Sequence, residues 1–287
     1  MMSLPAAVEV VADDGIRLHA DVDGIGPHLV ILHGLGYAGW AAGPLRELLR
    51  NRCTVWSLDT RGSGRSDKPL GPYSVQRFAD DAGALLDLID EPVHLLGYSM
   101  GGYVAQTVAH DRPESIRSLT LVSTSAGGLG AEDVPSETRA HWERHAHLPP
   151  AEFARTTMPL SFSDGWPQRH PEDFERILAL RLAAPTPGHA WRAQYDASAR
   201  FLASGYDVSR LDMPTLVIHG SDDRVVPVAN GRDLAARLPR ARYHEITGGH
   251  LLHLEDPRFI ADLIADLLAS PHQTIAHHTE RNDHAHH

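Results

Sequence analysis

The sequence has few cysteines and no long apolar runs. Its 287 residues include one cysteine, Cys53, which excludes an intrachain disulfide. Cys53 stands at the start of an apolar run that predicts a strand, and this position favours a small buried side chain with an inert thiol. No apolar run approaches the ~20 residues that a membrane-spanning helix needs, and residues 1–5 lack the apolar stretch of a secretory signal. These features predict a cytoplasmic protein.

Positive charge is also scarce. The 26 Lys and Arg residues are outnumbered by 37 Asp and Glu residues, so the formal net charge is −11. Because nucleic acids and anionic membranes are not attracted to an acidic protein, neither is an expected partner. His141, His145 and His147 have ligand-like spacing but lack the further ligands of a metal motif, and no glycine-rich dinucleotide fingerprint follows a strand. We expect no metal and no cofactor, and the oligomeric state stays open.

Short apolar runs alternate with helical patterns over much of the chain. Residues 8–12 and 16–20 flank an Asp-Asp-Gly turn and predict an antiparallel hairpin. Five further runs are continuously apolar, near residues 28–32, 53–58, 93–97, 118–123 and 215–219. Parallel strands that are covered on both faces have this pattern. After Ser74, the predicted N-cap, apolar residues recur on one helical face up to Ile89. The alternation predicts an α/β fold with a mostly parallel, doubly wound sheet.

The most informative motif is a G-x-S-x-G pentapeptide, Gly97-Tyr98-Ser99-Met100-Gly101. It lies between the apolar run at 93–96 and a helical stretch from Met100 to about His110. A sharp strand-to-helix turn of this kind exposes the serine hydroxyl at the edge of a sheet. The flanking glycines are needed because a Cβ at either position would clash. The motif predicts that Ser99 is a nucleophile.

A serine nucleophile needs a base, and the base needs an orienting acid. After the run at 215–219 the chain continues through Ser221, Asp222 and Asp223, and after a last strand near 242–246 it reaches His250. Upstream, the run at 28–32 ends in His33-Gly34-Leu35-Gly36, a loop that could turn a backbone N–H toward the serine. The order serine, acid, histidine is the one that this architecture uses.

These pieces resemble the α/β-hydrolase superfamily over about residues 8–268. Two segments, Leu-Asp-Thr-Arg-Gly at 58–62 and Gly-Pro-Tyr-Ser at 71–74, are similar in sequence to members of the 3-oxoadipate enol-lactonase and small carboxylesterase branch. The resemblance implies that His250 is the general base, that Asp223 orients it, and that the N–H groups of Leu35 and Met100 form the oxyanion hole. Asp222 remains an alternative for the acid.

The resemblance also implies a division of the chain. Residues 1–126 and 208–270 would form the hydrolase core. Residues 127–207, which are interrupted by seven prolines from Pro149 to Pro187, would form a helical cap over the active site. Short helices are expected from Pro171 to Arg181 and around Trp191 to Phe201. The polar, histidine-rich tail at 271–287 is expected to be disordered.

Other polar and aromatic residues are predicted to stabilise a turn or to line the substrate pocket. Asp59, Arg61 and Asp67 are expected to fix a turn. The substrate pocket under the cap is expected to be lined by four aromatic residues, Trp142, Phe162, Trp166 and Trp191.

The sequence thus predicts a cofactor-free serine hydrolase that cleaves a small carboxylic ester or lactone through an acyl-enzyme. Two alternatives use the same triad, hydrolysis of a C–C bond and perhydrolase activity. The C–C hydrolases generally carry a tryptophan after the catalytic histidine, whereas Leu251 stands here. A ligand receptor that keeps the fold without catalysis is a third alternative.

Overall fold

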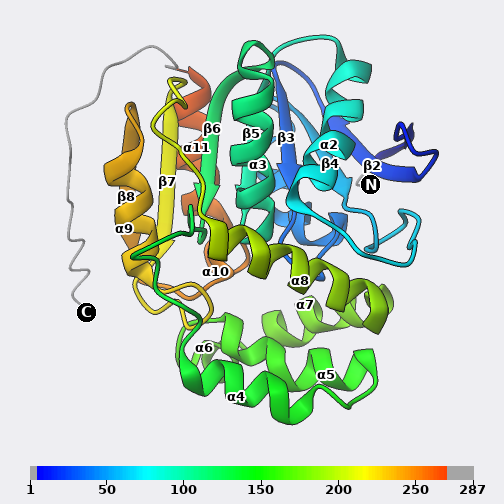
Figure 1. The fold of residues 1–287 in the computed structure, drawn as a ribbon, viewed down its shortest axis with the longest axis vertical. Helices are drawn as coiled ribbons and strands as arrows, with labels where there is room; N and C mark the ends of the chain where they lie inside the picture. Colours follow the sequence, from blue (N-terminus) through cyan, green and yellow to red (C-terminus); the bar gives the residue numbers. More distant parts are fainter. Residues whose placement is uncertain (1–4, 270–287) are drawn as a thin grey trace.

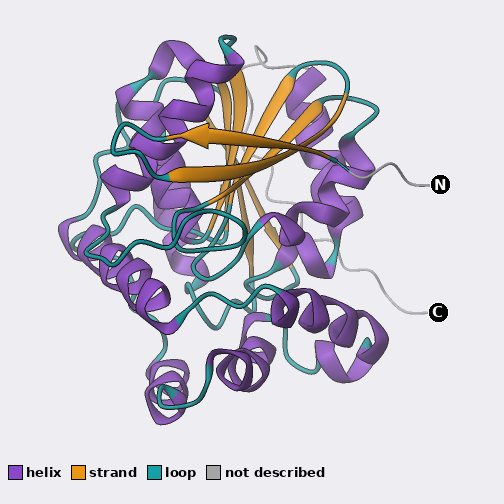
Figure 2. Ribbon diagram, turned by 90° about the vertical axis from the view of Figure 1, so that its right-hand side faces the viewer, coloured by secondary structure: helices purple, strands orange, loops and turns teal. Residues whose placement is uncertain are grey.

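The computed structural model describes residues 5–269, and an eight-stranded sheet runs through its centre (Figures 1 and 2). The strands are β1 (Ala6–Val11), β2 (Arg17–Gly24), β3 (His28–Leu32), β4 (Thr54–Asp59), β5 (Val93–Tyr98), β6 (Ile116–Val122), β7 (Thr215–Gly220) and β8 (Ala241–Ile246). Their order in the sheet is β1-β2-β4-β3-β5-β6-β7-β8. β2 pairs antiparallel with both neighbours, and β3 to β8 are parallel. The predicted hairpin and mostly parallel sheet are confirmed.

Helices cover both faces of this sheet (Figure 2). One face carries α2 (Val75–Ile89), α3 (Met100–Asp111) and α9 (Val228–Arg237), and the other carries α1 (Gly43–Leu49) and α11 (Pro257–Ala269). The chain therefore has the doubly wound α/β architecture of the predicted fold class.

The strand side chains divide between two apolar clusters. Leu29 and Ile31 of β3 pack with α1 and α11, whereas Val30 and Leu32 pack with α2 and α3. Successive side chains of a strand point to opposite faces, so a strand that is covered on both faces needs apolar residues at every position. This explains the continuous apolar runs in the sequence.

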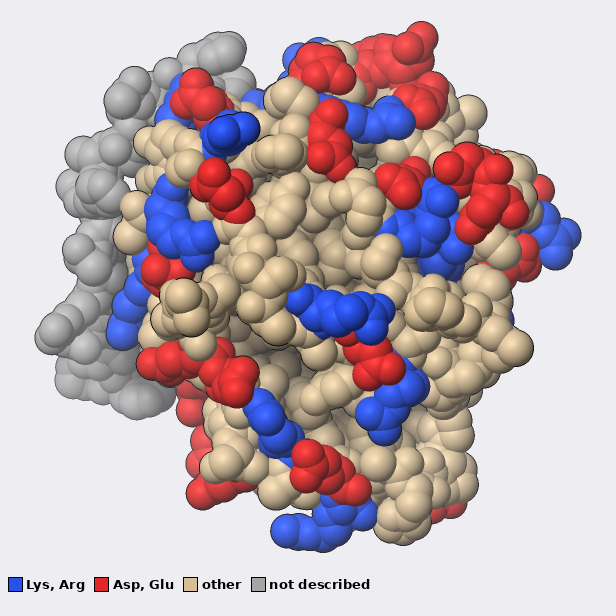
Figure 3. Space-filling model, viewed as in Figure 1, with Lys and Arg blue, Asp and Glu red and all other residues tan. Residues whose placement is uncertain are grey.

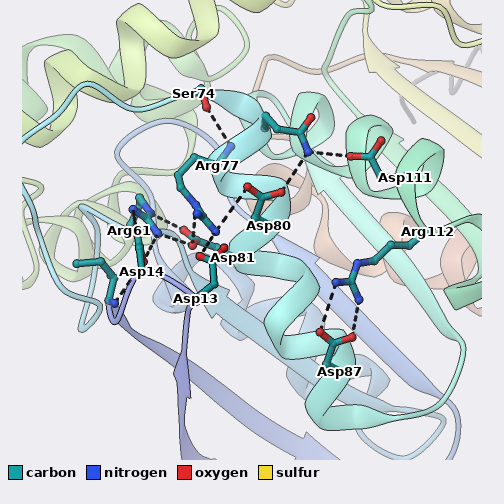
Figure 4. Close-up of polar contacts among 12 residues, drawn as sticks. Asp13, Asp14, Arg61, Ser74, Arg77, Asp80, Asp81, Asp87, Asp111 and Arg112 are labelled. Atoms are coloured by element: carbon teal, nitrogen blue, oxygen red, sulfur yellow. Dashed lines mark hydrogen bonds and ion pairs between the residues drawn. The ribbon is translucent and has the colours of Figure 1, made fainter.

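The N-terminus of α2 is capped as predicted. The backbone N–H of Arg77 donates to Ser74 Oγ at 3.0 Å, and Ser74 has the extended backbone of an N-cap (Figure 4). Along the helix, apolar residues at the expected spacing, Val75, Phe78, Ala79, Ala82, Leu85 and Leu86, are buried.

The chain between β6 and β7 leaves the sheet and forms a group of helices beyond the ends of the parallel strands (Figure 1). They are α4 (Ser136–His145), α5 (Pro150–Thr157), α6 (Trp166–Arg169), α7 (Pro171–Ala183) and α8 (Gly188–Ser204). Prolines stand in the first turns of α5, α6 and α7, where a missing N–H costs no hydrogen bond. These prolines thus mark where the helices begin.

Four shorter elements complete the part of the chain that the structure describes: η1 (Gly39–Ala42), η2 (Pro113–Ser115), η3 (Met158–Ser161) and α10 (Leu252–Glu255). No helix within residues 5–269 combines the length and the apolar character that crossing a bilayer requires. The tail at 271–287 lies outside the described residues.

Cys53 is fully buried immediately before β4. Its Sγ lies 3.6 Å from the Leu49 carbonyl oxygen, and burial raises the pKa of the thiol to about 11. The thiol is therefore protonated and shielded near neutral pH, as the sequence predicted.

Candidate active site

Ser99 lies on a sharp turn between β5 and α3. Its backbone has φ 53° and ψ −124°, a conformation that a residue with a side chain rarely adopts. A Cβ at Gly97 would lie 2.2 Å from the Gly101 carbonyl oxygen, and a Cβ at Gly101 would lie 2.1 Å from that of Leu32. Only glycine fits at either position, so the turn around Ser99 depends on both.

The candidate residues come from four parallel strands. Leu35 follows β3, Ser99 follows β5, Asp223 follows β7 and His250 follows β8. The carboxyl ends of parallel strands meet at one edge of a sheet, and the helices α4 to α8 lie beyond that edge (Figure 1). A cavity of about 450 Å³ opens there, and Leu35, Ser99, Met100 and His250 all line it.

Asp223 is bonded to His250. The Nδ1 atom of His250 lies 2.8 Å from Asp223 Oδ2, and both residues are buried. The backbone N–H groups of Val225 and Val226 each donate to Asp223 Oδ1 at 2.8 Å. His219, also buried, places its Nε2 3.3 Å from Asp223 Oδ2. Both oxygens of the Asp223 carboxylate are therefore held, Oδ1 by backbone N–H groups and Oδ2 by histidine side chains.

The charge of Asp223 follows from these contacts. Burial by itself would raise the pKa of this carboxyl group, but the neighbouring His250 and His219 outweigh burial and hold the pKa below its usual value. Asp223 is therefore ionised and accepts a hydrogen bond from His250 Nδ1, which leaves His250 Nε2 to act on a substrate or on Ser99.

Asp222 has a different partner. Its Oδ2 accepts a hydrogen bond from the backbone N–H of Asp164 at 2.5 Å, and it makes no contact with His250 within the described chain. Of the two adjacent aspartates, the structure brings only Asp223 to the histidine.

Ser99 and His250 share the cavity, but no hydrogen bond joins them in the described part of the chain. Nucleophile and base are often too far apart for a hydrogen bond without a bound substrate. The arrangement therefore supplies an oriented histidine and a partly buried serine on a strained turn, both lining one cavity.

Two backbone N–H groups are available for an oxyanion. Met100 begins α3, so its N–H has no partner inside the helix. The Leu35 N–H donates to no residue in the described chain, whereas the next N–H, that of Gly36, is bonded to Gln194 Oε1 at 2.9 Å. The predicted pair, Leu35 and Met100, are thus free donors at the cavity.

The four aromatic residues expected in the pocket divide into two pairs. Trp142 and Trp191 line the cavity. Phe162 and Trp166 do not, because they stack on each other with ring centroids 4.6 Å apart inside the apolar cluster of α1 and α11. Phe162 is fully buried in this cluster, so its ring packs in the core and does not line the cavity.

The two histidines nearest to His250 lie elsewhere. His244 lies within β8. His253 lies in α10 with its ring 4.1 Å from that of Tyr98, centroid to centroid, and neither of its nitrogens has a hydrogen-bond partner in the described chain. Burial lowers the pKa of His253 to about 3.

The charged residues at 59–67 stabilise loops, as the sequence predicted. Arg61 is buried and donates to both carboxylate oxygens of Asp81, each at 2.6 Å, and to Asp14 at 2.8 Å (Figure 4). Asp59 accepts hydrogen bonds from the backbone N–H groups of Gly39 and Arg65. Asp67 accepts three from Arg17, one from its backbone N–H and two from its guanidinium.

Three residues near the site were not predicted, namely Arg181, Gln194 and His219. His219 comes four residues before Asp223 at the end of a strand, which is the one sequence signal for its position. Gln194 is fully buried in α8 and joins the Gly36 loop to the loop at 61–63. Arg181 of α7 lines the cavity and bonds to Tyr37.

Comparison with known proteins agrees with this geometry. The sequence model of a family described as alpha/beta hydrolase fold matches residues 27–257. The chain is 30% identical over 263 residues to the poly(3-hydroxyalkanoate) depolymerase of Ectopseudomonas oleovorans, covering 88% of this chain and 89% of that protein. It is 30% identical over 205 residues to 3-oxoadipate enol-lactonase 2 of Acinetobacter baylyi, covering 71% and 74%.

A solved structure is also similar. The thermophilic esterase from Thermogutta terrifontis superposes with a TM-score of 0.79 at 26% identity, covering 93% of this chain and all of that one. Since the family match spans most of the chain, and the relatives above are named depolymerase, lactonase and esterase, the chain is a hydrolase that belongs to the alpha/beta hydrolase fold family.

Proposed function

We propose that the chain is a serine hydrolase that cleaves a small carboxylic ester or lactone with the triad Ser99, His250 and Asp223. The bond between His250 Nδ1 and Asp223 Oδ2, 2.8 Å long, carries the proposal because it orients the imidazole beside Ser99 in one cavity. The esterase and lactonase relatives support the substrate class.

The reaction would proceed in two halves. Ser99 Oγ adds to the substrate carbonyl carbon while His250 Nε2 takes the serine proton, and the N–H groups of Leu35 and Met100 stabilise the oxyanion. The alcohol leaves with the proton from His250, and Ser99 remains acylated. Water then attacks the acyl carbon with His250 as base, and the acid is released. Asp223 stays ionised and stabilises the imidazolium.

The segment from 127 to 207 would act as the cap of this site. Its helices carry Trp142 and Trp191, which line the cavity that Ser99 shares. In this proposal the core supplies the chemistry, and the cap supplies the shape of the substrate pocket.

The test compares the wild-type protein with Ser99→Ala on short- and medium-chain p-nitrophenyl esters and on a set of lactones. We expect wild-type turnover, no turnover above background in the variant, and labelling of the wild-type serine by a fluorophosphonate probe. Absence of both turnover and labelling would contradict the proposal. Labelling without turnover would keep the triad and redirect the substrate search to C–C bonds and bulkier lactones.

A further inference from the structure

The cavity beside Ser99 contains a buried positive charge that the proposed reaction does not use. Arg181 stands on α7 at the spacing of Phe174, Ile177 and Leu178, the buried face of that helix. Its side chain lines the same cavity as Ser99, yet the residue is only 8% exposed. A guanidinium is always ionised, so a full charge is removed from bulk water here.

This charge has no acidic partner in the described part of the chain. Arg181 Nη1 donates to Tyr37 Oη at 2.7 Å, and the guanidinium carbon lies 4.5 Å from the centre of the Tyr37 ring. Within residues 5–269, Arg181 forms no ion pair with a carboxylate. Its two other nitrogens have no hydrogen bond in that range, and neither is sealed from solvent, so they face the cavity.

Another buried arginine of the same chain has its charge balanced by carboxylates. Arg61 is 4% exposed and binds the carboxylates of Asp81 and Asp14 (Figure 4). On the face drawn in Figure 3, basic and acidic side chains are likewise interspersed. Arg181 departs from this pattern. A buried charge without a counter-ion is unfavourable, and a bound anion would remove that cost.

Arg181 also lies close to the loop that supplies the oxyanion hole. A Cβ built on Gly36 would lie 3.8 Å from Arg181 Nη2, and Gly36 follows Leu35 directly. Thr186 and Gln194 hold this loop through the carbonyl oxygen and the N–H of Gly36. An anion on Arg181 would therefore be a short distance from a carbonyl group bound at Leu35.

A second cavity, of about 230 Å³, is lined by Arg181 as well, together with Trp142 and Trp191. Arg181 thus stands where the two cavities meet. Arg139 also lines both cavities, but it is paired with Asp133 at 3.2 Å, and Arg192 lines the second cavity. Of these three arginines only Arg181 is buried.

We propose that Arg181 forms an anion subsite and that the substrate is a small ester or lactone that carries a carboxylate a few carbons from the scissile carbonyl. The planar guanidinium presents two N–H groups to a carboxylate in matching geometry. This inference rests on the proposed serine hydrolase function, and it assigns Arg181 to specificity, not to bond cleavage.

The test uses ester pairs that differ only in charge. The monoethyl esters of succinate, glutarate and adipate are compared with analogues in which the free carboxylate is a carboxamide, and acid release is titrated at constant pH. We expect wild-type kcat/KM to be about 10–100 times higher for the carboxylate of at least one chain length, since a charge-assisted hydrogen bond contributes about that factor.

Two variants separate recognition from structure. Arg181→Met should bring the ratio of kcat/KM for the carboxylate to kcat/KM for the carboxamide close to one, and Arg181→Lys should retain part of the preference. Fluorophosphonate labelling of Ser99 checks that each variant keeps a working triad.

The outcomes distinguish the two proposals. If wild type cleaves both members of every pair equally, or if Arg181→Met lowers both rates by the same factor, the anion subsite is wrong and Arg181 only holds the Tyr37 loop. If no ester is cleaved and Ser99 is not labelled, the serine hydrolase function itself is wrong. The preference for the carboxylate ester is measured on the wild-type protein itself, so the proposal is tested even if Arg181→Met does not fold.

Discussion

At the scale of the residue, two adjacent aspartates differ in what they contact. Asp223 is bonded to His250 at 2.8 Å, whereas Asp222 accepts a hydrogen bond from the Asp164 N–H. We therefore predict that Asp223→Asn lowers kcat by about 10³–10⁴-fold, because an amide no longer favours the required tautomer or stabilises the imidazolium. The measurement is steady-state turnover of the best ester substrate.

The matched control is the neighbouring position. Asp222→Asn should change kcat by less than about threefold, since its partner is a backbone N–H of the loop at 164 and an amide oxygen still accepts that bond. Equal losses in the two variants would mean that the loop, and not the contact with His250, determines activity.

At the scale of the element, α8 is tied to the oxyanion loop by one side chain. Gln194 is fully buried, accepts a hydrogen bond from the Gly36 N–H, and donates to the Arg61 carbonyl oxygen and to Ser63 Oγ. We predict that Gln194→Ala lowers kcat at least tenfold and the free energy of unfolding by about 2–4 kcal/mol, because the Gly36 N–H and the Arg61 carbonyl oxygen lose a buried partner and Ser63 Oγ keeps only Thr186. Denaturant unfolding and ester turnover measure the two effects.

Ser204→Ala provides the control on the same helix. Ser204 is exposed and its hydroxyl bonds only to carbonyl oxygens of its own turn, those of Arg200 and Phe201. Its loss should change neither quantity appreciably. An active, equally stable Gln194→Ala protein would show that the oxyanion loop holds its shape without α8.

The elements themselves were largely predictable, and their contacts were not. The continuous apolar run at 215–219 is a local signal for a strand, and β7 forms there. The hydroxyl of Ser74 before a helical pattern is a local signal for a helix N-terminus, and α2 begins there. Gln194 and Gly36 are 158 positions apart, and their contact depends on how α8 packs. Phe162 has the same aromatic character as Trp142, so composition does not reveal that one packs in the core and the other lines the cavity.

At the scale of the whole molecule, buried histidines couple stability to pH. Burial lowers the pKa of His33 and of His253 to about 3 and that of His94 to about 4, from an ordinary value of 6.5. Between pH 6.5 and these values the unfolded chain binds protons that the folded chain does not. The free energy of unfolding should therefore be highest above pH 6.5 and should fall as the pH decreases through this window.

We predict that His253→Phe reduces the slope of the free energy of unfolding against pH by up to about 1.4 kcal/mol per pH unit, because one titrating group is lost. It should also raise the free energy of unfolding at pH 7.5 by about 1–3 kcal/mol, since neither ring nitrogen has a hydrogen-bond partner in the described chain. Denaturant unfolding at pH 5 and pH 7.5 gives both numbers.

His94→Phe is the contrasting variant. It should reduce the slope as well, but it should lower stability at pH 7.5, because His94 Nδ1 lies 2.7 Å from Ser118 Oγ and that hydroxyl would lose its partner. A His253→Phe protein that is less stable than wild type at pH 7.5 would contradict the argument from unpaired nitrogens.

The burial of Cys53 has a practical consequence for spectroscopy. Because the only native thiol is enclosed and protonated, a maleimide dye should react with a cysteine introduced on the surface and not with Cys53. Leu129 has a fully exposed side chain and lines the cavity that Ser99 shares. A dye attached through Leu129→Cys would therefore report by its fluorescence when a molecule enters the cavity, independently of whether that molecule is hydrolysed.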